Sequence, residues 1–280
     1  MINTIILSYI TFGYFGAFLF YLLLMFMGRT VFGRIATFVA MSSLAAHSFA
    51  VILRWVESYR LGMGQPPFSN LYESLIFFAW TISFLYLIVE WRTKNKTAGA
   101  FVLPLAFLAM AYASFSPNIT SRIQPLIPAL QSNWLITHVI TCFFAYAAFG
   151  LSFGFSIMYF LKRLDTQTSH SNFLKRIPRA VILDDLNYQM VAIGFLMLTL
   201  GIITGSVWAS NAWGRYWGWD PKETWSLITW LVYAAVLHSR MVRGWSGKTI
   251  ALMSIIGFFC VLITYFGVNY LAGLHSYATS

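Results

Sequence analysis

The sequence has 280 residues, of which 59% are hydrophobic and only 9% are charged. Charged residues supply about a quarter of an ordinary soluble domain, so this composition excludes that class and predicts an integral membrane protein. The formal net charge of +10 does not indicate nucleic acid as a partner, because the basic residues fall in loops between apolar segments, where membrane topology places them.

Eight apolar segments, taken in chain order, are candidates for membrane-spanning helices, each of which needs about 20 residues. They cover residues 5–27, 34–56, 72–91, 98–114, 134–161, 188–208, 223–242 and 248–270. The fourth is short and contains Pro104, which leaves a count of seven spans open, although packed membrane helices tolerate proline. The first segment lacks the basic start and the cleavage site of a signal peptide, so we expect it to remain as a helix.

The expected fold is therefore an all-α integral membrane protein, a bundle of about eight transmembrane helices with an outer tryptophan-rich loop. Nothing divides the chain into separate domains, so residues 1–280 are expected to form a single transmembrane bundle.

The basic residues set the expected orientation, because cytoplasmic loops collect Lys and Arg. Thirteen of them lie in alternate loops that are expected to face the cytoplasm: Arg29, Arg34, Arg92, Lys94, Lys96, Lys162, Arg163, Lys175, Arg176, Arg179, Arg240, Arg243 and Lys248. The loops between hold only Arg60, Arg122, Arg215 and Lys222. Both termini and the loop at 209–223 are thus expected on the outer side of the membrane.

Three polar features accompany the second and third segments. Arg54 and Glu57 are three residues apart, so they are expected to pair with each other at the outer boundary. His47, near the middle of the second segment, is either a packed histidine or a ligand, and both interpretations stay open. Asn70 followed by Glu73 has the pattern of a capping box that begins the third helix.

The fifth and sixth segments are joined by the longest expected cytoplasmic connection, residues 162–187. Its polar and basic character indicates a stretch along the membrane surface. Within the sixth segment, Gly201 and Gly205 form a G-x-x-x-G pattern, which favours close packing of another helix. Cys142 and Cys260 lie within expected helices and outside any C-x-x-C motif, so the chain is neither a thiol reductant nor itself a c-type cytochrome.

The stretch that leads into the seventh segment holds six of the chain's eleven tryptophans. They are Trp208, Trp213, Trp217, Trp219, Trp225 and Trp230. Enrichment of tryptophan at the membrane interface explains one or two of them. Six beside one outer loop indicate a platform for a large, flat, apolar ligand, and haem is such a ligand.

The sequence from Asp220 to Glu223 is a strong helix start, with Asp220 as N-cap, Pro221 at the first position and Glu223 at the third. The positive end of that helix, together with Arg215 and Lys222, suits an anionic group such as a haem propionate.

Two histidines flank the tryptophan-rich loop on the expected outer side, His138 at the end of the fifth segment and His275 after the eighth. Imidazole is a common axial ligand of haem iron, so this pair is predicted to bind it. His238 lies about 22 Å along the seventh helix at ~1.5 Å per residue and is predicted to serve a second, inner haem, with His47 as its candidate partner. His170, in the polar connection, is expected to be solvated.

These residues resemble the System II cytochrome c assembly proteins of the CcsA/ResC type, whose tryptophan-rich signature is called the WWD domain. The signature runs from Trp213 through Asp220 to Trp225 and continues through Trp230 to His238. Supporting segments lie at 71–76, 134–139, 194–202 and 267–277, so the cytochrome c assembly region is expected over residues 66–277.

The resemblance implies that His138 and His275 are the axial ligands of haem b beside the WWD loop and that His238 binds a membrane-embedded haem. The other implied haem-binding residues are Trp213, Trp217, Trp219, Asp220 and Trp225. It further implies a partner subunit of the CcsB/ResB type, apocytochrome c as substrate, and a location in a bacterial plasma membrane or a thylakoid.

The expected function is cytochrome c biogenesis, in which haem is presented at the outer face and attached by thioether bonds to C-x-x-C-H apocytochromes. The attacking thiols belong to the substrate, so no catalytic side chain is expected and proximity supplies most of the rate. A haem exporter that loads a separate carrier without ligation stays open as an alternative. So do an electron-transfer b-type haem protein and a transporter that does not bind haem.

Overall fold

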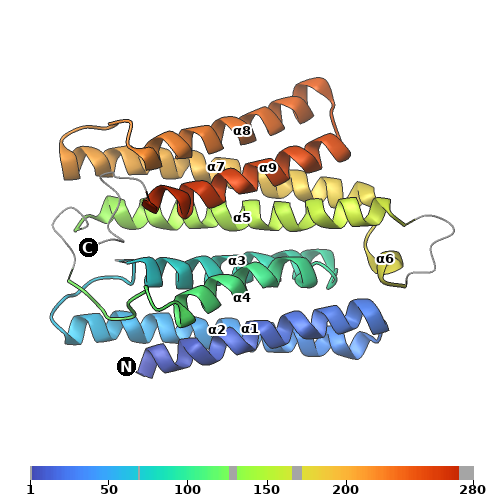
Figure 1. Ribbon diagram of the computed structural model, residues 1–280, viewed down its shortest axis with the longest axis horizontal. Coiled ribbons are helices and arrows are strands. Elements are labelled where there is room, and N and C mark those ends of the chain that lie inside the picture. The colour runs from blue at the N-terminus through green and yellow to red at the C-terminus, as the bar shows by residue number, and fades with distance from the viewer. Residues whose placement is uncertain (1, 69, 126–130, 166–171, 271–280) are drawn as a thin grey trace.

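The computed structural model describes residues 2–68, 70–125, 131–165 and 172–270, and every regular element in these ranges is helical (Figure 1). The long helices are α1 (Ile2–Met27), α2 (Thr30–Arg60), α3 (Leu71–Thr93), α4 (Gly99–Phe115), α5 (Asn133–Arg163), α7 (Ala180–Trp213), α8 (Pro221–Arg243) and α9 (Lys248–Tyr265). A short helix, α6 (Asn172–Arg176), lies between α5 and α7, and a 3-10 turn, η2 (Gly267–Tyr270), follows α9.

Each of the predicted segments falls on one of the long helices, in the predicted order. Six of them, α1, α2, α3, α5, α7 and α9, are long and apolar enough to cross a membrane. The helix α4 has only 17 residues and contains Pro104. The helix α8 is continuous, but its apolar residues alternate with serine, threonine and charged residues. The all-α membrane fold is confirmed. Length and composition support six spans directly, while α4 and α8 run beside them in the same bundle (Figure 1).

The long helices form two groups. In the first group α1 packs along α2 and α4, and α3 packs along α4. In the second group α5 packs along α7 and α9, and α8 packs along α9. Contacts of α5 with α3 and α4 join the groups, so that α5 runs through the middle of the molecule in Figure 1, between α1–α4 below and α7–α9 above.

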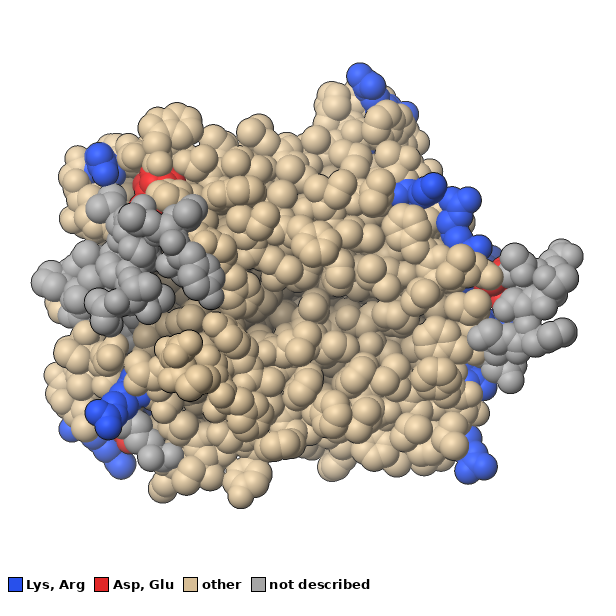
Figure 2. All heavy atoms as spheres, in the orientation of Figure 1, with Lys and Arg blue, Asp and Glu red and all other residues tan. Residues whose placement is uncertain are grey.

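The surface of the bundle suits a bilayer. On the face shown in Figure 2, the charged side chains gather at the two ends, and the belt between them is made of other residues. Large apolar side chains are exposed on the helices that form this belt, among them Phe38, Leu196 and Phe259. A soluble monomer rarely exposes so much contiguous apolar surface, whereas lipid tails require it.

The contacts of Arg54 differ from those predicted from the sequence. Its Nε donates to Oε1 of Glu73 on α3 at 2.7 Å, and both side chains are 1% exposed. Its Nη1 also donates to the carbonyl oxygen of Ser121 at 2.9 Å. Glu57 instead accepts a hydrogen bond from Asn3 of α1. The predicted Arg54–Glu57 pair is wrong, because Arg54 faces the interior, where a charge requires a partner on a neighbouring helix.

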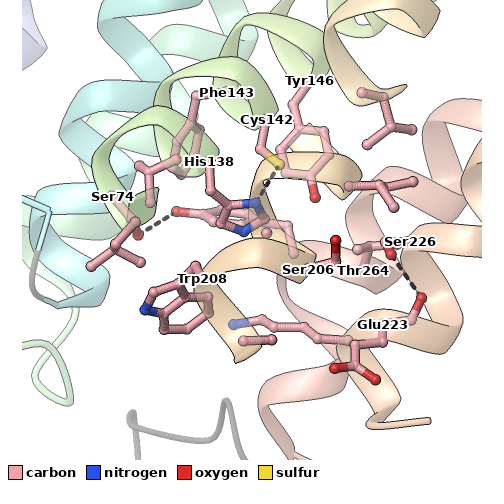
Figure 3. Close-up of a pocket in the computed structure, with 18 of the residues that line it drawn as sticks. Ser74, His138, Cys142, Phe143, Tyr146, Ser206, Trp208, Glu223, Ser226 and Thr264 are labelled. Atoms are coloured by element: carbon pink, nitrogen blue, oxygen red, sulfur yellow. Dashed lines mark hydrogen bonds between the residues drawn. The ribbon is translucent and has the colours of Figure 1, made fainter. Parts of the chain in front are cut away.

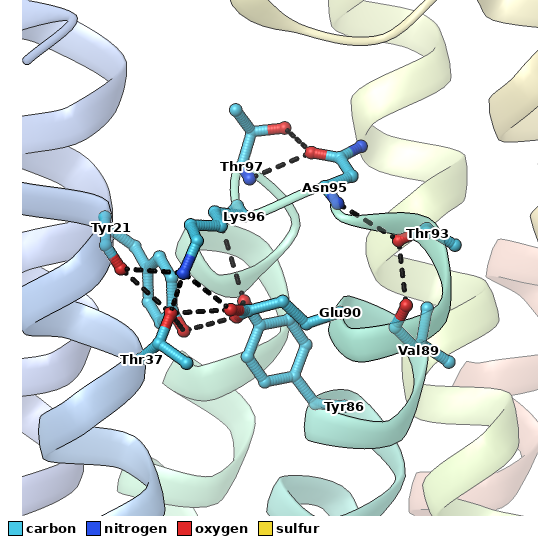
Figure 4. A network of polar contacts seen from close by, with 10 residues as sticks. Tyr21, Thr37, Tyr86, Val89, Glu90, Thr93, Asn95, Lys96 and Thr97 are labelled. Carbon is cyan, nitrogen blue, oxygen red and sulfur yellow. Dashed lines mark hydrogen bonds and ion pairs between the residues drawn. The ribbon is translucent and has the colours of Figure 1, made fainter. Parts of the chain in front are cut away.

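A second polar cluster, which we call the Glu90 cluster, joins α1, α2 and α3 (Figure 4). It lies at the end of the first group of helices away from Arg54. The Glu90 carboxylate accepts hydrogen bonds from the hydroxyls of Tyr21 and Thr37, both at 2.5 Å, and of Tyr86 at 2.6 Å. The Lys96 ammonium lies 3.2 Å from the same carboxylate. Four side chains from four places in the sequence thus meet one buried acid.

The start of α7 corrects a second prediction. Residues 180–187, expected as the last part of a surface connection, form the first turns of α7. The acidic residue Asp184 is satisfied there, since its carboxylate pairs with Arg240 of α8 and accepts the backbone N–H of Gly247 at 2.9 Å. The polar residues that favoured a loop are therefore contacts between α7, α8 and the turn before α9. His170 lies outside the described residues.

Candidate functional site

A pocket opens at the end of the bundle where the tryptophan-rich segment joins α7 to α8 (Figure 3). Its volume is about 240 Å³, and α3, α5, α7, α8 and α9 all contribute to its walls. The walls are mainly apolar and include Phe143, Tyr146, Leu198 and Tyr265. An apolar cavity with a few polar groups at chosen points is the usual form of a small-molecule site.

His138 projects from the N-terminal part of α5 into this pocket (Figure 3). Its Nδ1 lies 2.7 Å from the carbonyl oxygen of Gly201 on α7. A carbonyl only accepts, so Nδ1 carries the proton and donates, and in the neutral ring Nε2 is then the nitrogen with the lone pair. A histidine that binds a metal through one ring nitrogen commonly donates the other N–H to a backbone carbonyl in this way. The His138 ring is thus in the tautomer that a metal ligand needs.

Aromatic and sulfur groups surround the His138 ring. Trp208 stacks on it, with ring centroids 5.9 Å apart and planes at 18°. The Cys142 Sγ lies 3.6 Å from Nδ1. Behind Trp208, the edge of Trp213 packs at a centroid distance of 4.8 Å. Trp208 is only 2% exposed, so it both lines the pocket and packs against the neighbours of α7.

The predicted haem-binding tryptophans occupy different positions. Trp217 lines the pocket, and its buried Nε1–H has no hydrogen-bond partner within the described part of the chain. Trp219 packs edge-on against it at 5.8 Å but is 69% exposed on the outer surface. Trp213 lies behind the wall, and Trp225 lies in the first turns of α8, where its carbonyl oxygen accepts from Thr264 at 3.2 Å. The structure brings Trp208 and Trp217 to the pocket itself.

Two predicted helix starts lie at the pocket. The N-cap at Asn70 is confirmed without the reciprocal Glu73 contact of a capping box, because the Glu73 carboxylate pairs with Arg54. The start at Asp220 has the full box. Asn70 Oδ1 accepts the backbone N–H of Glu73 at 2.9 Å at the start of α3. At the start of α8, Asp220 accepts from the Lys222 N–H at 3.0 Å, and the Glu223 side chain accepts the Asp220 N–H at 3.1 Å. Asp220 is 6% exposed, and both Lys222 and Glu223 line the pocket. The start of α8 therefore presents its positive end beside the cavity.

The other predicted ligands lie apart from the pocket or outside the described residues. His238 is an exposed residue of α8, towards the C-terminal end of that helix. His275 lies outside the described residues. His47 is fully buried in the α1–α4 group, with its Nδ1 3.1 Å from the Tyr14 hydroxyl. The structure does not bring His47 next to His238.

Sequence reasoning misses two contacts at this site. Cys142 lines the pocket beside His138, and the spacing of four residues between them, which places both on one face of a helix, was the available signal. The Ser74 and Tyr265 hydroxyls are 2.7 Å apart and connect α3 to the end of α9. No sequence pattern links residues 191 positions apart.

Comparison with known proteins places this site in a family. The family described as "Cytochrome C assembly protein" matches residues 68–275. The chain is 38% identical to the cytochrome c biogenesis protein CcsA of Heterosigma akashiwo, with 92% of this chain and 89% of that protein covered. It is 41% identical to CcsA of Chlorella vulgaris over 84% of this chain and 83% of that protein, and 40% identical to CcsA of Prochlorococcus marinus over 81% and 78%.

Among solved structures, the fold is similar to that of the cytochrome c haem lyase CcmF, with a TM-score of 0.71 and 18% sequence identity. The match covers 94% of this chain and 46% of CcmF, so the chain spans about half the length of that protein. The similarity shows a shared helical fold. Since the family match covers most of the sequence and includes the pocket, the chain belongs to the cytochrome c assembly protein family, as a CcsA-type cytochrome c biogenesis protein.

Proposed function

We propose that the protein holds haem in the outer pocket and promotes its thioether attachment to apocytochromes that carry a C-x-x-C-H motif. The observation that carries this proposal is the state of His138. The hydrogen bond from its Nδ1–H to the Gly201 carbonyl favours the tautomer in which Nε2 would be the nitrogen that binds iron, and the ring stands in an apolar, aromatic cavity that suits a flat porphyrin. His275 would supply a second ligand to the iron, as the resemblance to the family implies.

The polar groups of the pocket fit the anionic edge of haem. Lys222 lines the cavity at the start of α8, where the helix end also favours negative charge. The buried Trp217 Nε1–H has no acceptor in the described part of the chain, and a buried donor without a partner is costly. A propionate would satisfy both groups. We propose that they orient haem so that its vinyl edge faces the apocytochrome.

The chemical step needs no nucleophile from this chain. Each thioether forms when an S–H of the apocytochrome adds across a vinyl double bond, so that sulfur bonds to one vinyl carbon and the proton goes to the other. The two bonds are made without net oxidation or reduction. The contribution of His138 and the tryptophan walls is orientation, which converts an encounter between two molecules into a reaction within one complex.

A partner subunit of the CcsB/ResB type is part of the proposal, with His238 as ligand of an inner haem that the two subunits share. His238 is exposed on α8, near the exposed apolar residues Leu231, Met241 and Val242. An ionisable side chain that faces lipid is costly, so contact with a partner or with haem accounts for it better. The excess of basic residues in alternate loops supports cytoplasmic placement of the inner end.

The test is purification with such a partner, followed by absorption spectra and an assay for covalent haem on apocytochrome c. His138→Gly should lower outer haem and cytochrome maturation, and imidazole in the medium should restore both by occupying the vacant site. His238→Ala should lose haem at both positions, whereas a His275 variant should keep the inner one. Full haem and normal maturation in His138→Gly would overturn the proposal. Haem release to a carrier without thioether formation would identify an exporter.

A further inference from the structure

We propose that Gly201 and Gly205 of α7 are positioning residues for His138: they form a stretch of helix without side chains on which the imidazole lies, and this stretch sets the tautomer and direction of the ring. The inference rests on the proposed function, since it concerns the ligand that would bind haem iron. Neither glycine need touch haem, because both act through His138.

Gly205 provides the space for the ring. A Cβ at this position would lie 2.6 Å from Nδ1 and 2.8 Å from Cε1 of His138, closer than non-bonded heavy atoms approach. Trp208 stacks on the ring at a centroid distance of 5.9 Å and limits its movement on that side. Any side chain at residue 205 therefore forces the imidazole to rotate, and rotation takes Nδ1 away from its acceptor on α7.

Gly201 provides that acceptor and a second space. Its carbonyl oxygen accepts from His138 Nδ1 at 2.7 Å and from the Thr204 hydroxyl at 3.2 Å. A Cβ at residue 201 would lie 2.6 Å from the Sγ of Cys142, the thiol that also lies beside Nδ1. A side chain at residue 201 would therefore displace the Cys142 thiol. It would move the His138 imidazole only indirectly, through that thiol.

The positions of the close contacts separate this role from helix packing alone. The helices α5 and α7 also meet tightly at Gly194, where a Cβ would lie 2.5 Å from the Phe149 ring. Packing by itself predicts similar consequences at Gly194 and Gly205. Positioning predicts that only Gly205 changes the chemistry of His138, because Phe149 lies deeper in the bundle and does not line the pocket.

The first experiment compares Gly205→Ala, Gly194→Ala and Gly16→Ala in the full chain purified with its partner. Gly205→Ala should weaken haem retention by about 10- to 100-fold, the usual effect of removing support from a metal-binding histidine, and should change the absorption spectrum. Gly194→Ala should reduce the yield of folded protein but leave the spectrum per folded protein unchanged. Gly16 has no heavy atom within 4 Å of an added Cβ, so Gly16→Ala should behave as the wild type.

A second pair of variants tests the order of contacts at residue 201. Gly201→Ala should have a smaller effect on haem retention than Gly205→Ala. Adding Cys142→Ala should restore much of the loss in Gly201→Ala, because it removes the sulfur that a new Cβ would meet. The same addition should not rescue Gly205→Ala, in which the clash is with the ring itself.

The tautomer can be measured without haem or activity. In haem-free protein labelled with ¹⁵N-histidine, the signals of His138 are identified by their loss in His138→Gln. Wild-type protein should show a protonated Nδ1 and an unprotonated Nε2, and Gly205→Ala should lose this pattern. If Gly205→Ala keeps both the pattern and full haem retention, the positioning role is wrong.

A double variant completes the test. In His138→Gly protein without added imidazole, the added Gly205→Ala change should cause no further loss, since residues that act through the same group are not additive. A full additional loss would show a packing role and overturn the inference. If His138→Gly alone keeps all its haem, the proposed function fails instead, and the tautomer measurement still decides the role of Gly205.

Discussion

The Glu90 cluster and the pocket beside His138 both bury polar side chains near an end of the bundle, but the two regions differ in whether these polar groups have hydrogen-bond partners. In the Glu90 cluster three hydroxyls donate to one carboxylate, and an ammonium lies beside it. In the pocket the buried Trp217 Nε1–H has no partner within the described residues, and the walls around it are mainly apolar.

The difference separates structure from function. Buried polar groups that satisfy one another hold helices in a fixed arrangement, and the Glu90 cluster does this for α1, α2 and α3. A buried donor without a partner in a cavity is costly unless a ligand supplies an acceptor. Variants of the first region should therefore change stability, and variants of the second should change ligand binding.

The largest effect on stability is expected from the buried ion pair of Arg54 and Glu73 in the α1–α4 group. Arg54→Leu should lower the free energy of unfolding by about 3–5 kcal/mol, because it leaves Glu73 buried without its cation. Unfolding in mixed detergent micelles measures this. The double variant Arg54→Leu, Glu73→Leu should be closer to the wild type. A single variant as stable as the wild type would contradict the assignment.

The Glu90 cluster itself should show a somewhat smaller loss. Glu90→Leu deprives two buried tyrosine hydroxyls of their acceptor at a cost of about 1–3 kcal/mol for each unsatisfied group, so we expect roughly 3 kcal/mol in all. Glu90→Gln, which keeps an acceptor oxygen, should lose less. Haem content per folded protein should stay unchanged in both. A selective loss of haem would break the contrast between the two regions.

In the pocket, Trp217→Phe removes an N–H and keeps an aromatic ring. A hydrogen bond to a charged group is worth about 1.5–3 kcal/mol, so haem retention should fall by roughly 10- to 100-fold with little change in unfolding. Trp230→Phe is the matched control, because its Nε1 already donates to Thr199 at 2.9 Å. It should lower stability and spare haem. Equal haem loss in both variants would refute the role of Trp217.

The smallest effect is expected at the N-cap of α8. Asp220→Ala should cost about 1 kcal/mol of stability, as loss of an N-cap usually does. Asp220→Asn should retain most of it, since asparagine also caps well. Thermal unfolding of both variants measures the difference. A large loss of haem in Asp220→Asn at normal stability would show that the carboxylate has a role in the pocket beyond the cap.

Much of the fold could be predicted from local properties of the sequence. The apolar segments locate the long helices, and the caps at Asn70 and Asp220 are confirmed at their starts. Local rules failed where a polar residue has a distant partner. Asp184 favoured a loop when only the sequence was considered, but in the structure it is part of a helix, where it pairs with Arg240 and accepts the Gly247 N–H. Arg54 and Glu57 are neighbours along one helix but face different partners.

The candidate site shows the same division. Tryptophan density and the family signature pointed to the segment between α7 and α8, and His138 could be predicted as a pocket residue from its place beside that segment. Which tryptophans reach the cavity could not be predicted: Trp208 and Trp217 do, while Trp219 faces outward. The hydrogen bond between His138 and the Gly201 carbonyl could not be predicted from the sequence either.

The sequence by itself determined the membrane class, the order of the helices and the family, because apolar length, loop charge and signature residues are properties of short stretches of chain. Only the tertiary structure decided which side chains meet. That outcome depends on how far each helix is rotated and shifted against its neighbours, which results from the packing of all the helices at once. Gly201 and Gly205 illustrate the reason: the G-x-x-x-G pattern predicts close approach of a helix, but the rotation of α5 decides that His138 and Cys142 fill the space.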